Sequence, residues 1–109
     1  MEKKIVVKAS EGKHRNFKGV DFSVLSYSNN SMVTKMLYKE NDNVPFHNHI
    51  NEQSGYVISG KYLLKFLDKS ETIEEGDSYT IPSNVEHSLE VIIPGIVIDF
   101  FSPKRDDYL

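Results

Sequence analysis

Hydrophobic and polar residues alternate along much of the chain, a period of two that is typical of β-strands with one buried face. Four segments show strand character most clearly: residues 18–28, 56–67, 88–93 and 96–101. In the first of them, Val20, Phe22 and Val24 fall on the same side. No window carries a sustained hydrophobic stripe at a 3.6-residue period, so the sequence predicts strands and almost no helix.

Clusters of turn-forming residues separate these segments and keep each strand short. They fall at residues 28–31, 41–43, 67–71, 74–77 and 94–95. Many short strands in a chain of 109 residues predict an all-β sandwich or barrel, an architecture that also limits exposed sheet edges. This length suits a single hydrophobic core, so we expect residues 1–109 to form one domain.

Composition excludes several classes of protein. The net charge is -3 and no block of five or six like charges occurs, which argues against nucleic acid or an anionic membrane as a partner. The chain has no cysteine, so a disulfide framework, an iron–sulfur cluster and thiol catalysis are all excluded. No apolar run is long enough for a signal peptide or a membrane span, and we expect a cytoplasmic protein.

Two histidines, His47 and His49, lie one residue apart. Alternate residues of a strand face the same side, which would place the two side chains about 6 to 7 Å apart along the backbone. Two imidazoles so placed can share one metal ion, each through a bond of roughly 2.0 to 2.2 Å. The alternative is a pair of polar residues at a loop or strand edge. Gln53 falls on the same face if the strand continues.

The spacing of residues 41–60 and 76–91 resembles the paired signature of the cupins, G-x5-H-x-H-x3,4-E-x6-G followed by G-x5-P-x-G-x2-H-x3-N. The resemblance implies a small single-domain jelly-roll β-barrel with one divalent transition metal ion at its mouth. By position the implied metal ligands are His47, His49, Gln53 and His87. Nickel, zinc, iron, cobalt and manganese all suit such a donor set, so the metal is not identified.

The chain departs from the cupin pattern at four places. Asn41 and Asn84 replace glycines, and asparagine is the non-glycine residue that best tolerates a left-handed backbone. Val91 replaces the closing asparagine, which is not a ligand position. Gln53 replaces the usual glutamate, so the ion would keep more of its positive charge and favour anionic ligands. Neighbouring Glu52 is a competing ligand if a bulge turns it inward.

The tail of the chain offers further candidates in Asp99, Phe101 and Arg105. Aspartate can move a proton, phenylalanine can wall a sugar ring, and arginine can clamp a carboxylate. The runs "NEQSGYVISG", "GDSYTIP" and "DFFSPKR" resemble the cupins of pectin degradation. That resemblance implies a catalytic role for these three residues in converting 4,5-unsaturated uronate monosaccharides into linear keto-deoxyuronates by ring opening and enol–keto tautomerisation.

The register of the last two strands decides whether these tail residues reach the metal site. If Pro94-Gly95 is a two-residue hairpin loop, the His87 face carries Ile98 and Phe100 in place of Asp99 and Phe101. The catalytic interpretation therefore needs a bulge or a loop of odd length. Ser102 and Pro103 are expected to end the last strand.

Three functions remain open on the sequence alone. The first is the uronate isomerase, with a small anionic sugar acid as substrate. The second is a metal-dependent cupin dioxygenase, and the third is a cupin that binds a small molecule without catalysis. Related small cupins also imply a homodimer in which the N-terminal segment 4–9 pairs across the interface.

Overall fold

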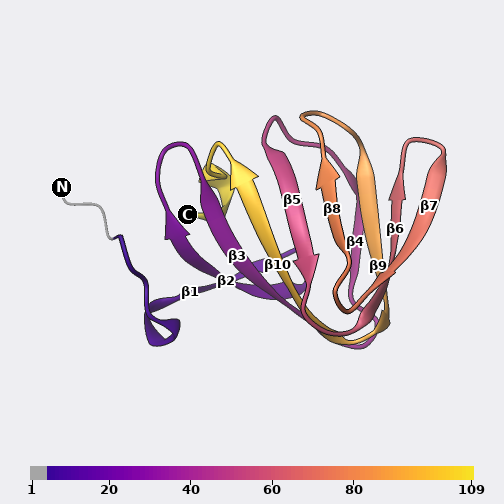
Figure 1. Ribbon diagram of the computed structural model, residues 1–109, viewed down its shortest axis with the longest axis horizontal. Helices are drawn as coiled ribbons and strands as arrows, with labels where there is room; N and C mark the ends of the chain where they lie inside the picture. The colour runs from indigo at the N-terminus through magenta and orange to yellow at the C-terminus, as the bar shows by residue number, and fades with distance from the viewer. Residues whose placement is uncertain (1–4) are drawn as a thin grey trace.

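The computed structural model describes residues 5–109 and forms two antiparallel sheets that face each other (Figure 1). The strands are β1 Lys13–Phe17, β2 Val20–Tyr27, β3 Met32–Tyr38, β4 Asn43–His47, β5 Glu52–Val57, β6 Lys61–Phe66, β7 Lys69–Glu74, β8 Ser78–Ile81, β9 His87–Ile93 and β10 Gly95–Ser102. Two short 3-10 helices, η1 Ala9–Glu11 and η2 Asp106–Tyr108, complete the elements of the described chain. The predicted dominance of strands is confirmed.

One sheet has the order β1-β2-β3-β10-β5-β8 and the other has the order β4-β9-β6-β7. The prediction of an all-β jelly roll is confirmed, with the two sheets packed as a sandwich that is not closed by strand pairing into a continuous barrel. Within residues 5–109 there is no helix with the length and apolar character needed to cross a membrane.

The core lies between the sheets and is built from the inward positions of each strand. Val20, Phe22 and Val24 of β2 are buried, as their alternation predicts. Tyr62 of β6 meets Tyr38 of β3 across the core, with ring centroids 5.2 Å apart. Apolar burial of this kind is the main driving force for closing the two sheets.

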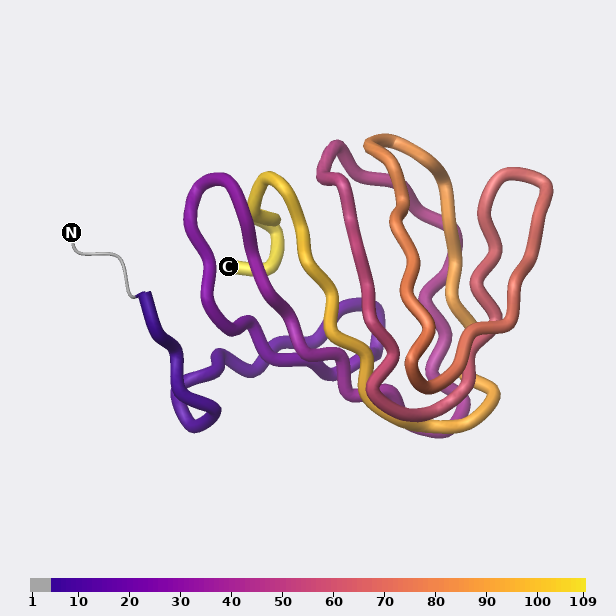
Figure 2. The backbone as a smooth tube through the Cα atoms, viewed as in Figure 1, coloured from indigo at the N-terminus to yellow at the C-terminus, as the bar shows by residue number. Residues whose placement is uncertain are grey.

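The connection between β9 and β10 is not a hairpin. β9 pairs with β4 and β6, whereas β10 pairs with β3 and β5 in the other sheet. Figure 2 shows the chain leaving β9 and crossing below to the six-stranded sheet, where it begins β10. The hairpin register is therefore wrong, because the strand partner of β10 is set by the sheet it joins and not by the loop before it.

On β10 the inward residues are Asp99 and Phe101, and both are buried. Phe100 lies on the opposite face and is exposed. β10 ends at Ser102, as expected from the proline that follows.

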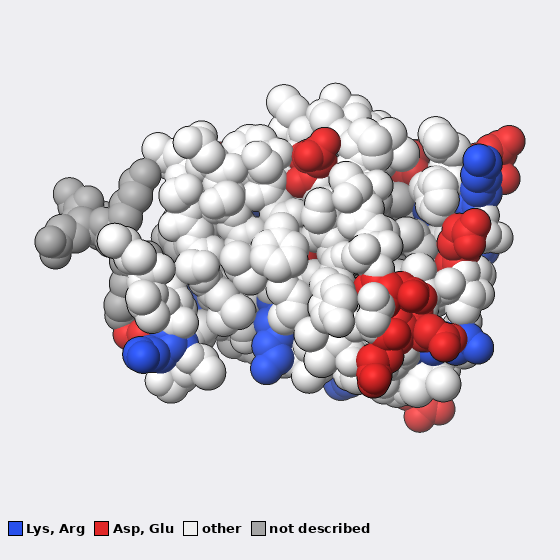
Figure 3. Space-filling view, viewed as in Figure 1, with Lys and Arg blue, Asp and Glu red and all other residues white. Residues whose placement is uncertain are grey.

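Most surface turns agree with the turn clusters of the sequence, except that β7 begins at Lys69, inside the cluster at 67–71. Asn41 and Asn84 adopt positive φ values of 69° and 64°, the conformation for which the cupin pattern uses glycine. The end of β7 and the turn after it expose Glu74, Glu75 and Asp77, and Figure 3 shows acidic side chains gathered beside the largely uncharged face of the six-stranded sheet.

The N-terminal segment expected to pair across a dimer interface is not a strand. Lys4 lies outside the described residues, and Ile5–Lys8 are in an irregular conformation before η1. The homodimer stays a prediction.

Candidate metal centre

Three histidines converge at one end of the sandwich. His47 ends β4 and His87 begins β9, and these two residues are paired in the four-stranded sheet. His49 lies in the loop after β4, so the strand does not continue to it as expected. Its ring centroid is nevertheless 5.5 Å from that of His47 and 5.0 Å from that of His87.

The loop that carries His49 is held by the second cupin-like segment. The amide of Asn84 donates to the carbonyl of His49 at 2.8 Å, and the hydroxyl of Ser83 donates to the carbonyl of Ile50 at 2.6 Å. The left-handed backbone of Asn84 aims its amide at the loop. The two segments that share the motif spacing are therefore joined directly by hydrogen bonds.

All three imidazoles hold their Nδ1 atom against a backbone carbonyl. The carbonyl partners are Pro45 for His47 at 2.9 Å, Asn51 for His49 at 2.8 Å and Val85 for His87 at 2.8 Å. A carbonyl can only accept, so each Nδ1 carries the proton and each Nε2 presents a lone pair.

The Nε2 atoms face a common point. One ligand atom from each histidine lies within 4.8 Å of the others, and ligands on opposite sides of one ion are about 4 Å apart when each bond is roughly 2.1 Å. Nε2 of His87 is buried and has no hydrogen-bond partner among the residues that the structure describes. A buried lone pair without a donor is costly, and a cation is the natural partner for it.

Electrostatics keep these histidines neutral. Burial lowers the pKa of His47, His49 and His87, in the last case from 6.5 to about 4. The hydrogen bonds to backbone carbonyls raise these pKa values, but by less than burial lowers them. Near neutral pH all three rings are therefore unprotonated at Nε2, the state in which imidazole binds a metal.

Gln53 of β5 approaches the cluster from the opposite sheet. Its Oε1 lies 3.1 Å from Nε2 of His49. Because Nδ1 of His49 holds the proton, this contact joins two acceptors, and a cation between them would remove the repulsion. Glu52, the competing ligand, is exposed. The residues present thus fit a divalent ion with His47, His49, His87 and Gln53 as its ligands.

Asp99 lies directly behind Gln53. It is 2% exposed and accepts a hydrogen bond of 2.5 Å from the phenol of Tyr79. Burial raises the pKa of Asp99 to about 6, against the opposing effect of hydrogen bonds from Tyr79 and Gln53. A carboxyl with that pKa can exchange a proton near neutral pH.

Arg105 is buried and already paired. Its Nε and Nη2 atoms donate to the carboxylate of Asp107 at 3.2 and 2.7 Å, and Nη1 donates to the hydroxyl of Tyr108 at 2.8 Å. The guanidinium also stacks on the Tyr108 ring, 4.0 Å from its centroid, and lies 5.2 Å from the centroids of Phe17 and Phe101. This cluster stands beside the histidines.

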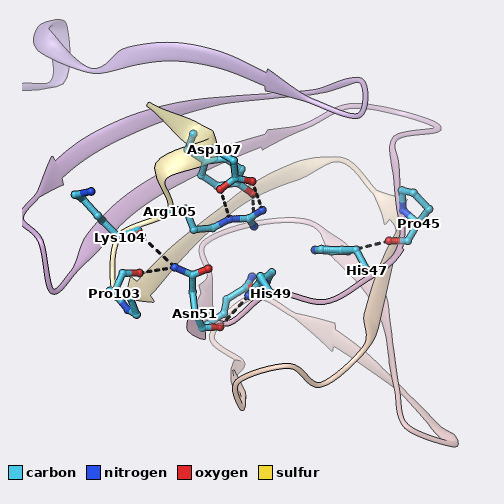
Figure 4. A network of polar contacts seen from close by, with 10 residues as sticks. Pro45, His47, His49, Asn51, Pro103, Lys104, Arg105 and Asp107 are labelled. Carbon is cyan, nitrogen blue, oxygen red and sulfur yellow. Dashed lines mark hydrogen bonds and ion pairs between the residues drawn. The ribbon is translucent and has the colours of Figure 1, made fainter.

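Asn51 ties the tail to the histidine loop. Its side-chain amide donates to the carbonyls of Pro103 and Lys104 at 2.8 and 3.1 Å, while its own carbonyl accepts from His49. Figure 4 shows this bridge, with Arg105 and Asp107 above His47 and His49. The tail is thereby placed over the site by a residue inside the histidine motif.

A cavity of about 30 Å³ lies between these groups. Its lining includes His47, His87, Gln53, Asp99 and Arg105, together with three tyrosines. Phe101 contacts the site through its ring, 5.8 Å from that of His49 in an edge-on arrangement. The sequence thus brings all seven candidate residues to one end of the fold.

Sequence reasoning missed four residues that shape this site: Asn51, Tyr79, Asp107 and Tyr108. Asn51 lies within the motif and Asp107 lies two residues after Arg105, so both were visible in the sequence. Tyr79 and Tyr108 reach the site through cross-strand and tail packing, for which a single sequence carries no signal.

Comparison with known proteins places the chain in a family. It is 27% identical over 93 residues to the pectin degradation protein KdgF of Dickeya dadantii, covering 84% of each protein. It is also 27% identical over 89 residues to a 3-hydroxyanthranilate 3,4-dioxygenase of Shewanella woodyi, covering 78% of this chain but 47% of that protein. The solved structure of KdgF from a Halomonas species superposes with a TM-score of 0.86 at 23% identity, covering 95% of this chain and 99% of that one. Residues 34–97 match the Cupin_2 family, described as a cupin domain, and the chain therefore belongs to the cupins.

Proposed function

We propose that this cupin is a metal-dependent enzyme that converts 4,5-unsaturated uronate monosaccharides into linear keto-deoxyuronates. The observation that carries the proposal is the convergence of three neutral imidazoles and the Gln53 oxygen on one point. Similarity to a pectin degradation protein over 84% of the chain supports the class of substrate.

The reaction is an isomerisation. The ring C–O bond of the cyclic hemiacetal breaks as the hemiacetal hydroxyl loses its proton and becomes an aldehyde. The released enol then gains a proton on carbon and loses its hydroxyl proton to become a ketone, so that no atom is gained or lost overall. A divalent ion at the histidines would supply Lewis-acid polarisation of a substrate oxygen.

Asp99 is the proposed proton carrier. It lines the cavity beside Gln53, and its pKa of about 6 allows both protonation states near neutral pH. A carboxyl with its ordinary pKa would be a weaker acid–base catalyst at that pH, so the burial that raises the pKa of Asp99 serves the chemistry.

Arg105 is the proposed clamp for the substrate carboxylate, since a planar guanidinium matches a carboxylate through two hydrogen bonds. Asp107 now takes those bonds, so the substrate would displace an exposed carboxylate from the same donors. Phe101 is proposed to support this arrangement as an apolar wall that contacts both His49 and Arg105.

The test follows the ultraviolet absorbance of the conjugated enol ether in an unsaturated uronate. The metal-loaded protein should abolish the absorbance, EDTA should stop the reaction, and His47→Ala and Asp99→Ala should slow it strongly. His14→Ala is the matched control, because the His14 side chain is 67% exposed and lies outside the site. An unchanged absorbance with each of the five candidate metals would refute the proposal.

A dioxygenase is the second candidate, favoured by the similarity to the 3-hydroxyanthranilate 3,4-dioxygenase. An iron-loaded protein of that kind would consume dissolved oxygen in the presence of its aromatic substrate. An oxygen electrode separates the two functions, because the uronate isomerisation uses no oxygen.

A further inference from the structure

Three residues lie in one row across three neighbouring strands of the six-stranded sheet. Asp99 of β10 pairs with Gly55 of β5, and Gly55 pairs with Tyr79 of β8. A Cβ atom at Gly55 would lie 2.1 Å from Cζ of the Tyr79 ring. The Tyr79 side chain therefore lies across the space that Gly55 leaves open, and only this allows its phenol to reach a strand two positions away.

The phenol of Tyr79 ends at the carboxylate of Asp99, to which it donates at 2.5 Å. Gln53 acts to lower the pKa values of both Asp99 and Tyr79, the effect of an amide donor placed beside them. Tyr79, Asp99 and Gln53 thus form a closed triangle of polar groups between the sheet and the histidine cluster.

This triangle fixes which way the Gln53 amide points. Its oxygen lies 3.1 Å from Nε2 of His49, which leaves its nitrogen as the donor on the side of Asp99 and Tyr79. The flipped amide would place its oxygen against the Asp99 carboxylate and leave acceptors facing each other in a buried site. Such an arrangement costs roughly 1–3 kcal/mol for each unsatisfied group.

The triangle also accounts for glutamine at position 53. A carboxylate there would lie against the buried Asp99 carboxylate, and two like charges in contact disfavour each other strongly.

We propose that Tyr79 is a positioning residue that acts through Asp99 to keep the Gln53 oxygen toward the histidines. The proposal rests on the metal site of the proposed function but not on its substrate. In this proposal, the absence of a side chain at Gly55 leaves the space that the Tyr79 ring occupies.

The first experiment measures Co²⁺ affinity and the visible absorption spectrum of the bound ion. Tyr79→Phe removes one hydroxyl and should weaken Co²⁺ binding about 10- to 100-fold, the range for partners that orient a metal ligand, and should alter the spectrum. Tyr56→Phe is the matched control, because Tyr56 is exposed on the opposite face of the same sheet. Far-ultraviolet circular dichroism checks that each variant is folded.

The second experiment exchanges the two groups. Gln53→Glu and Asp99→Asn should each weaken Co²⁺ binding, and the double variant should recover it to within about fivefold of wild type, because the amide and the carboxylate have changed places. A role that is merely structural would make the two losses add, with no recovery.

Each outcome tests a different part of the proposal. Co²⁺ binding by Tyr79→Phe within twofold of wild type would overturn the positioning role, and failure of the double variant to recover would overturn the pairing of Gln53 with Asp99. Absence of Co²⁺ binding by the wild-type protein would overturn the metal site and this proposal together. If the Co²⁺ results hold but uronates are not converted, the proposed function fails and the positioning role stands.

Discussion

The burial of His87 predicts that the metal-free protein loses stability in acid. Its pKa falls from 6.5 to about 4 in the folded state, so the unfolded chain takes up this proton first. The stability due to the neutral ring is therefore fully present above pH 6.5 and is lost progressively as the pH falls toward 4. The lowered pKa values of His47 and His49 act in the same direction.

The size of the effect follows from proton linkage. Between pH 7 and pH 5, His87 alone should remove about 2 kcal/mol of unfolding free energy. Asp99 acts oppositely, because burial raises its pKa from 3.8 to about 6 and the folded state takes up that proton first. Over the same interval Asp99 should add about 1 kcal/mol, which offsets part of the histidine loss.

The assay is urea unfolding in the presence of EDTA at pH 7 and pH 5, followed by circular dichroism because the chain contains no tryptophan. His87→Gln should show a loss between the two pH values that is smaller than in wild type by about 2 kcal/mol. His14→Gln, at an exposed position, should behave as wild type. Equal losses in His87→Gln and wild type would refute the burial of a neutral imidazole.

Three further outcomes are expected. His47→Ala should weaken Zn²⁺ binding by more than about 100-fold, a larger loss than is usual when a residue that only hydrogen-bonds to a metal ligand is changed. Competition with a chromogenic chelator measures this affinity. Asp107→Asn removes the exposed carboxylate that now occupies Arg105, so KM for a sugar acid should fall by up to roughly fivefold, whereas an unchanged KM would contradict displacement of that carboxylate. Gly55→Ala should cost about 1–3 kcal/mol in urea unfolding because the new methyl group overlaps the Tyr79 ring; Gly12→Ala, whose nearest neighbour is the end of a flexible leucine, is the control.

Motif spacing located the elements around the site better than alternation did. Alternation found β2, β9 and β10, but it merged β5 and β6 into one segment around the turn at 58–60. The turn-forming residues predicted a turn at 67–71, although β7 begins at Lys69. These strands are short, so each contains too few alternating hydrophobic and polar residues to define its ends.

The strand partners could not be predicted from the loops. Pro94-Gly95 has the composition of a hairpin turn, yet β9 and β10 belong to different sheets. Which sheet a strand joins depends on pairing between residues far apart in sequence, such as Asp99 with Thr34. The same long-range pairing brings Tyr79 to Asp99, which explains why that contact was not foreseen.

The structure also changes the argument for an anionic ligand. The missing charge of Gln53 suggested an under-neutralised ion, but the buried Asp99 carboxylate stands directly behind that residue. The preference for an anion in the proposed function would then rest on Arg105, whose guanidinium is buried and lies against aromatic rings. A carboxylate ligand can replace Asp107 there without leaving the buried cation unpaired, whereas a neutral sugar cannot. In the proposed function the tail would therefore select for the charge of the ligand before its shape.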